Sequence, residues 1–301
     1  MHDTDGSEEK LFDEAFLRKL ERLAIMSRRA TAGKLQGERR STKRGQSVEF
    51  ADFRPYAPGD DFRRIDWNAY ARLERFFIKL FVEEEDLTVH LVVDTSRSMD
   101  WGQPNKLAYA IKAAAALGYI ALAGLDRVTV RALGGKNNAN GGYFPPHRGK
   151  NQAFALFSFL SSLDADGRTD LAPRLRSYAA AAGQPGPLLL FSDLLDEGWQ
   201  DGLHAVAGRG FEVTVLHLLA PEEVEPELSG DLKLLDAETG AEVEITADYE
   251  MLARYKEGLA DWQNEIRRFC GARGIHFAPV TTSLPFEELL FAWLRRQGVL
   301  K

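Results

Sequence analysis

The chain has 301 residues, of which 45% are hydrophobic and 28% are charged, close to the usage of ordinary globular proteins. This composition excludes a disordered, collagen-like or fibrous protein and supplies enough apolar side chains for a packed core. The 38 basic and 45 acidic residues give a formal net charge of −7, which argues against non-specific binding to nucleic acid or to an anionic membrane.

The beginning of the sequence, MHDTDGSEEK, is acidic and polar and lacks the basic start and apolar core of a signal peptide. The single cysteine, Cys270, cannot form an internal disulfide. Residues 107–125 have nearly the length of a membrane-spanning helix, but they include Lys112 and are rich in alanine. We interpret this run as a buried helix of an α/β domain, and we expect a cytoplasmic protein without membrane insertion.

Residues 1–86 are expected to form an N-terminal segment. Its hydrophobic spacing predicts an amphipathic helix over 8–29, and the composition of 76–82 predicts a strand. The basic loop Arg28–Arg44 is interpreted as a solvated loop, with a docking surface for phosphate or for an acidic partner as the alternative.

The charged block Arg54–Arg75 is interpreted as an ion-pair network that holds this segment on the core. Trp67 and Tyr56 are expected to be its buried anchors. Arginine–carboxylate pairs of this kind specify geometry more than they stabilise.

From residue 87 onward, predicted strands and helices alternate. Strands are predicted at 87–94, 127–133, 141–144, 187–192, 211–219 and 274–279, helices at 106–125, 151–163, 171–182, 198–207, 249–272 and 286–296, and a hairpin at 232–235 and 242–245. This alternation predicts an α/β domain over 87–301, with a mostly parallel central sheet of Rossmann type and helices on both faces.

Polar side chains follow the predicted strands of this sheet. Asp94, Ser96 and Ser98 follow the first strand, Asp193 follows the strand at 187–192, and Thr169 lies in a loop before a helix. Ligands bind outside the carboxyl ends of parallel strands, so we expect these five side chains to converge. Oxygen ligands suit Mg²⁺ or another divalent cation, and neutral hydroxyls would leave that cation able to accept an anionic ligand. For each residue taken singly, helix capping is the alternative.

The spacing Asp94-x-Ser96-x-Ser98, followed by Thr169 and Asp193, resembles the metal-ion-dependent adhesion site of von Willebrand factor A domains. The resemblance implies that residues such as Ser96, Ser98 and Thr169 coordinate the metal directly. It also implies that Asp94 and Asp193 act through water, and that a carboxylate of a partner protein completes the coordination.

A set of unusual residues upstream of the first strand resembles a bacterial family catalogued as domain of unknown function 58, which has a von Willebrand A-like core. These residues are Glu49-Phe50, Arg54-x-Tyr56-x-Pro58-Gly59-Asp60-Asp61, Arg63-x-Ile65-Asp66-Trp67, Ala71-Arg72 and Glu83–Glu85. The resemblance implies that the protein works with a MoxR-type AAA+ ATPase in the assembly or activation of client proteins. Many family members carry membrane helices near the N-terminus, which this sequence does not lead us to expect here.

Two other functions are alternatives to a metal-dependent interaction module. A phosphatase-like, metal-dependent hydrolase would use Asp94 as nucleophile or ligand and Asp193 as ligand, but Ser96 stands where an Asp-x-Asp phosphatase has its second Asp, and other hydrolase motifs are absent. Nucleic-acid binding through Arg28–Arg44 lacks interleaved aromatic residues. We expect His90 and His217 to be core residues and Cys270 to be an inert thiol. The sequence therefore predicts a non-enzymatic, Mg²⁺-dependent interaction module that binds an acidic residue of a partner protein.

Overall fold

The computed structural model describes residues 11–25, 49–57, 60, 62, 65–82, 87–134, 142–168, 170–236, 240–296 and 298–300. The chain divides into two compact units: a small unit of residues 27–87, and a large unit of residues 1–26 together with 88–301. Of the described residues, 11–25 therefore group with the large unit and not with the small one.

The small unit contains an antiparallel pair of strands, β1 (Glu49–Pro55) and β2 (Phe77–Val82), with helix α3 (Trp67–Leu73) between them in the chain. Asp66 caps α3, because its carboxylate accepts hydrogen bonds from two backbone N–H groups of the first turn.

The charged block of the small unit differs in part from the expectation. Arg54 pairs with Asp60 at 2.9 Å, as an ion-pair network would require. Trp67, in contrast, is 60% exposed and is not a buried anchor, because it opens α3 and its ring meets Tyr70 and Phe76 edge-on. The basic loop Arg28–Arg44 lies outside the described residues.

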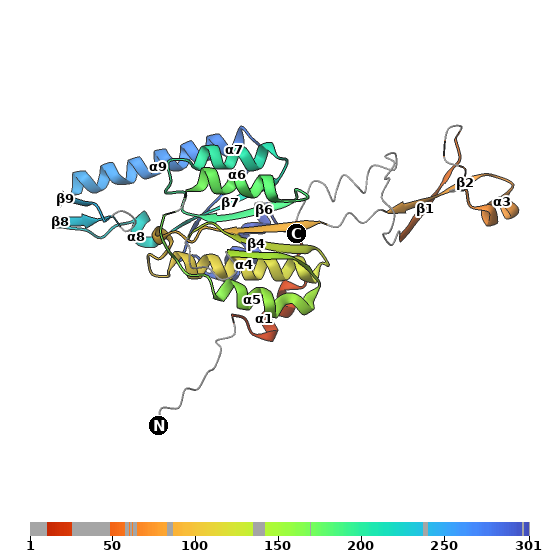
Figure 1. The fold of residues 1–301 in the computed structure, drawn as a ribbon, viewed down its shortest axis with the longest axis horizontal. Coiled ribbons are helices and arrows are strands. Elements are labelled where there is room, and N and C mark those ends of the chain that lie inside the picture. Colours follow the sequence, from red (N-terminus) through yellow and green to blue (C-terminus); the bar gives the residue numbers. More distant parts are fainter. Residues whose placement is uncertain are drawn as a thin grey trace, which may run out of the picture. The chain divides into compact units, whose positions relative to one another are not determined.

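The large unit is built on a six-stranded sheet with the order β10-β7-β6-β3-β4-β5 (Figure 1). All neighbouring strands are parallel except β4 and β5, which are antiparallel. The mostly parallel sheet predicted from the sequence is thereby confirmed. The strands are β3 (Thr88–Val93), β4 (Arg127–Ala132), β5 (Tyr143–Arg148), β6 (Pro187–Ser192), β7 (Glu212–Leu219) and β10 (His276–Thr281).

Two clusters of buried side chains lie on the two faces of this sheet. Val89, Leu91 and Val93 of β3 belong to one cluster and Val92 to the other, since successive side chains of a strand point to opposite faces. Both faces of β3 are therefore covered, which explains its largely apolar sequence.

Helices α1, α4 and α5 cover one face of the sheet, and α6, α7 and α9 cover the other (Figure 1). Their bounds are α1 (Glu14–Leu20), α4 (Lys106–Ala123), α5 (Ala153–Ser161), α6 (Leu171–Ala181), α7 (Trp199–Gly208) and α9 (Tyr249–Gly271). The amphipathic helix expected over 8–29 is thus represented by the shorter α1, which Asp13 caps.

Among the described residues, α4 is the one helix long and apolar enough to span a membrane, and 78% of it is buried inside the protein. Gly118 allows this helix to pack closely on α5, because a Cβ at that position would lie 2.6 Å from a methyl carbon of Leu156. This helix forms part of the larger buried cluster, as its composition predicts.

The remaining elements follow β7 and β10. Between β7 and α9 lie the short helix α8 (Pro221–Val224) and the hairpin of β8 (Gly230–Leu235) and β9 (Glu242–Ala247). After β10 the chain forms α10 (Phe286–Glu288), a π-helical turn (Leu289–Trp293) and α11 (Leu294–Arg296). Short 3-10 turns lie at Arg97–Met99 and Lys150–Gln152.

Candidate cation site at the carboxyl end of the sheet

The candidate site lies where the strand order of the sheet reverses. Numbered by their order in the chain, the six strands run 3-2-1-4-5-6 across the sheet, so strands one and four, β3 and β6, are neighbours. In open α/β sheets ligands bind beyond the carboxyl ends of the strands at such a reversal. Asp94 directly follows β3 and Asp193 directly follows β6, which places both predicted carboxylates at this point.

Asp94 is buried, with 2% of its surface exposed, and both of its carboxylate oxygens accept hydrogen bonds. Oδ1 accepts from the backbone N–H of Ser96 at 3.0 Å, and Oδ2 accepts from the hydroxyl of Ser192 at 2.7 Å. These bonds fix the orientation of the carboxylate.

The hydroxyl oxygens of Ser96 and Ser98 lie 2.9 Å apart. Two neighbouring ligands of an octahedral Mg²⁺, each about 2.1 Å from the ion, lie about 3.0 Å from each other. The pair therefore has the spacing that two adjacent ligands of one cation need.

Hydrogen bonds join the loop after β3 to two other loops. The hydroxyl of Thr95 accepts from Gly134 at 2.9 Å, and the carbonyl of Thr95 accepts from the backbone N–H of Asp166, also at 2.9 Å. The backbone N–H of Arg97 donates to the carbonyl of Gly167 at 3.0 Å. The loop that leads to position 169 thus contacts the serine loop, while Thr169 itself lies outside the described residues.

Asp193 is held by a lysine, by the backbone of its own loop and by a histidine of the next strand. Its Oδ2 accepts from the ammonium of Lys106 at 2.8 Å, and its Oδ1 accepts from the backbone N–H of Leu195 at 3.1 Å. Its backbone carbonyl lies 2.9 Å from Nε2 of His217. A carbonyl can only accept, so His217 carries its proton on Nε2.

Lys106, which is not among the predicted site residues, is completely buried. Its ammonium contacts Glu223 of α8 at 2.6 Å as well as Asp193. Burial acts to lower the pKa of Lys106, but the charges of the two carboxylates outweigh it and hold the pKa above its ordinary value. The lysine is therefore charged. A sequence signal did exist: a lysine directly precedes the apolar run 107–125.

The two strand histidines and the cysteine are buried, as expected. Burial lowers the pKa of His217 to about 4, so its ring is neutral at neutral pH. Its Nδ1 is the one buried side-chain nitrogen or oxygen without a hydrogen-bond partner among the described residues. Burial raises the pKa of Cys270 to about 12, which leaves the thiol protonated and unreactive.

The donors present are compatible with a hard divalent cation. No group of three or more His, Cys, Asp or Glu side chains suited to hold a metal occurs in the part of the chain that the structure describes. Ser96 and Ser98 could coordinate Mg²⁺ directly, and Asp94 could hold its water ligands. Such a site would hold fewer charged ligands than a carboxylate cage.

The large unit is an α/β protein with a mostly parallel six-stranded sheet and polar residues at its reversal point. Residues 52–265 match the model of a family described as "Protein of unknown function DUF58". The chain therefore belongs to the DUF58 family.

Relatives with similar sequences come from mycobacteria. The uncharacterized proteins Rv1480 of Mycobacterium tuberculosis and Mb1516 of Mycobacterium bovis are each 28% identical over 292 residues, with 93% of this chain and 90% of the relative covered.

Two solved structures are similar over 70% of this chain. The conserved hypothetical protein BatB from Bacteroides thetaiotaomicron is 17% identical, with 98% of it covered and a TM-score of 0.42. An aerotolerance-related membrane protein from Bacteroides fragilis is 16% identical, with 99% covered and a TM-score of 0.41.

Proposed function

We propose that this protein is a non-enzymatic, Mg²⁺-dependent interaction module of the cytoplasm, whose large unit is a von Willebrand factor A-like domain. In this proposal Ser96, Ser98 and Thr169 coordinate the cation, and Asp94 and Asp193 support it through water. The bound cation would supply an open coordination position for a carboxylate of a partner protein. The observation that carries the proposal is the 2.9 Å spacing of the Ser96 and Ser98 hydroxyls beside buried Asp94.

The chain's own residues account for the preference for an acidic partner. The serine hydroxyls are neutral ligands, and the charge of Asp193 is balanced by Lys106. A divalent cation held in this way keeps more of its positive charge than one held by several carboxylates, and it therefore attracts an anionic ligand.

The contacts of Asp94 favour binding over hydrolysis. A carboxylate nucleophile needs an oxygen free to approach the substrate within hydrogen-bond reach. Both oxygens of Asp94 already accept hydrogen bonds, and the residue is 2% exposed. A metal-dependent hydrolase that uses Asp94 and Asp193 remains the alternative which the experiment below separates from the proposal.

The partner proposed is a MoxR-type AAA+ ATPase or its client, as the family resemblance implies. The test is a pull-down of the purified ATPase of the same organism with the full-length chain, in Mg²⁺ and in EDTA. We expect a complex in Mg²⁺ that EDTA dissociates and that renewed Mg²⁺ restores. The variant Ser96→Ala should lose the complex, because one direct ligand is removed.

A matched control is Ser177→Ala, which removes a hydroxyl from an exposed position of α6. It should bind as the wild type does. A complex that is indifferent to EDTA and to Ser96→Ala would overturn the proposal. Metal-dependent phosphatase turnover that is lost in Asp94→Ala would favour the hydrolase instead.

A further inference from the structure

A buried lysine connects the candidate cation site to a surface helix. The ammonium of Lys106 lies 2.8 Å from Oδ2 of Asp193 and 2.6 Å from Oε1 of Glu223. The side chain of Lys106 is 0% exposed, that of Asp193 is 1% exposed and that of Glu223 is 18% exposed. Burial of the charged ammonium of Lys106 has a large desolvation cost, and pairing with the two carboxylates offsets that cost.

Each carboxylate bound to Lys106 is held at a second point. Asp193 also accepts the backbone N–H of Leu195. Glu223 accepts the backbone N–H of Ala220 through Oε2 at 2.7 Å, and its own carbonyl accepts the hydroxyl of Tyr255 on α9 at 2.7 Å. The three charged groups therefore keep fixed positions, and the ammonium stands between the site and α8.

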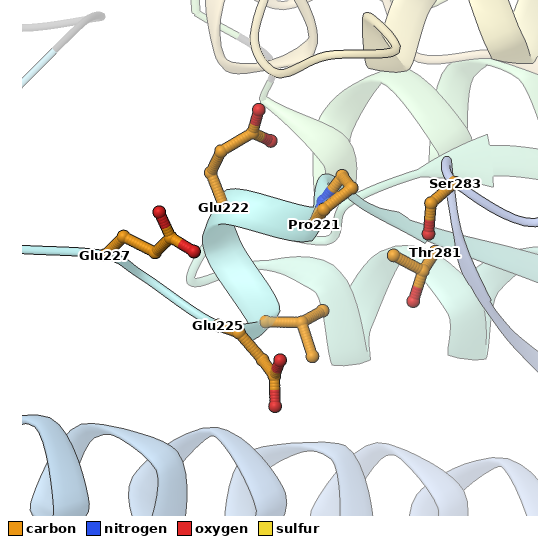
Figure 2. Close-up of a pocket in the computed structure, with 7 residues that line it drawn as sticks. Pro221, Glu222, Glu225, Glu227, Thr281 and Ser283 are labelled. Carbon is orange, nitrogen blue, oxygen red and sulfur yellow. The ribbon is translucent and has the colours of Figure 1, made fainter.

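The carboxylate of Glu223 points into the protein, toward Lys106, whereas those of the neighbouring acidic residues point outward. Glu222, Glu225 and Glu227 line a surface cavity of about 560 Å³ beside α8 (Figure 2). Glu225 meets Lys256 at 3.6 Å with its side chain 78% exposed. The inward carboxylate thus acts on the buried ammonium, whereas the outward ones act in solvent, where charge interactions are weak.

We propose that Lys106 is a positioning residue which sets the cation affinity of the candidate site, with Glu223 as the group that balances it. This inference rests on the proposed function, because it concerns the same cation. The ammonium holds Asp193 by charge and repels a second cation at the neighbouring position. Glu223 draws the ammonium toward α8 and reduces that repulsion.

The two charges must then have opposite effects on cation binding. Loss of the ammonium in Lys106→Met removes a repulsive charge and frees Asp193, so the cation should bind more tightly. Loss of the inward carboxylate in Glu223→Gln leaves the ammonium with Asp193 alone, so the cation should bind more weakly. A purely structural role for the cluster predicts weaker binding in both variants, since both would loosen the site.

The experiment measures Mn²⁺ binding to the full chain by electron paramagnetic resonance of the free ion, with competition by Mg²⁺. We expect Lys106→Met to tighten and Glu223→Gln to weaken binding, each by roughly tenfold, a usual size for coupling between charged groups of one site. The matched control is Glu225→Gln, which removes the same charge from the outward side and should stay within about twofold.

The outcomes separate this inference from the proposed function. A wild-type chain that binds no Mn²⁺ would overturn both. Wild-type binding with an unchanged affinity in Glu223→Gln, or with weaker binding in both variants, would overturn the role of Lys106 alone. If Lys106→Met is not recovered folded, as judged by circular dichroism, Lys106→Gln takes its place, because it removes the same charge and keeps a polar side chain between the two carboxylates.

Discussion

Ser192, the last residue of β6, donates its hydroxyl to Oδ2 of Asp94, the first residue after β3, at 2.7 Å. The same hydroxyl oxygen accepts the backbone N–H of Leu194 at 2.9 Å. Leu194 has a positive φ of 56°, a conformation that a non-glycine residue rarely adopts without support. One side chain therefore joins the two central strands at the candidate site and fixes the turn after β6.

The variant Ser192→Ala should destabilise the large unit. It removes the donor to Asp94 and leaves the N–H of Leu194 without its acceptor in a region that is fully buried. We expect a loss of about 1–3 kcal/mol in the free energy of unfolding, the cost of an unsatisfied buried polar group. Urea unfolding followed by circular dichroism measures it, with Ser177→Ala as the exposed control. Equal midpoints for the two variants would contradict the structural role of Ser192.

The variants Ser96→Ala and Ser98→Ala should affect cation binding much more than stability. Their hydroxyls contact each other at 2.9 Å, so removing one costs a single hydrogen bond, about 1 kcal/mol. If each hydroxyl coordinates the cation, each variant should weaken Mn²⁺ binding by roughly tenfold or more, the range known even for residues that only support metal ligands. Titration calorimetry with Mn²⁺ tests this, and an affinity unchanged in both variants would exclude the pair as ligands.

The close packing around Gly134 predicts that even an alanine there disturbs the loop after β3. A Cβ built there would lie 2.3 Å from the backbone carbon and oxygen of Thr95, closer than real Cβ atoms come. Gly134→Ala must therefore displace the loop after β3, and we expect a loss of about 1–3 kcal/mol, as for overpacking of a core. Cation binding should weaken with it.

The control for this change is Gly183→Ala, where the added Cβ would meet no atom within 4 Å. It should leave the unfolding midpoint in urea unchanged or slightly raised, because alanine restricts the unfolded chain. If Gly134→Ala were as stable as Gly183→Ala, the close approach of the two loops would be wrong.

Much of the architecture could be predicted because its causes are local. A largely apolar, β-branched run such as 87–93 marks a parallel strand covered on both faces, and Asp94 follows it directly. The Ser96 and Ser98 side chains lie on the same turn as Asp94. The position of Asp94 at the sheet edge therefore followed from strand composition and from the rule for ligand positions in parallel sheets.

The connections between distant residues could not be predicted in the same way. Lys106 lies 87 residues from Asp193 and 117 from Glu223 in the chain, and no periodicity relates these positions. The exposure of Trp67 was also missed, because aromatic residues are buried on average and the sequence does not show which one opens a short surface helix.

His90 gives the fold a stability that depends on pH. It is 3% exposed on β3, and its Nε2 donates to the carbonyl of Gln184 at 3.2 Å, so its Nδ1 accepts the hydroxyl of Tyr178 at 2.6 Å. Burial lowers the pKa of His90 from 6.5 to about 4. The folded protein thus requires the neutral ring, and protonation would also break the bond from Tyr178.

The sign of the effect follows from this lowered pKa. The unfolded chain binds the proton near pH 6.5, so the contribution of neutral His90 is complete above that pH and is lost as the pH falls toward 4. Within this window the loss is about 1.4 kcal/mol per pH unit.

Urea unfolding of wild type and His90→Gln at pH 7 and pH 5 isolates the contribution of His90 to stability, because His217 and the carboxylates titrate in both proteins. The wild type should be the more stable at pH 7, and its advantage should shrink by about 2 kcal/mol at pH 5. An advantage that stays constant between the two pH values would mean that His90 is not held neutral by the fold.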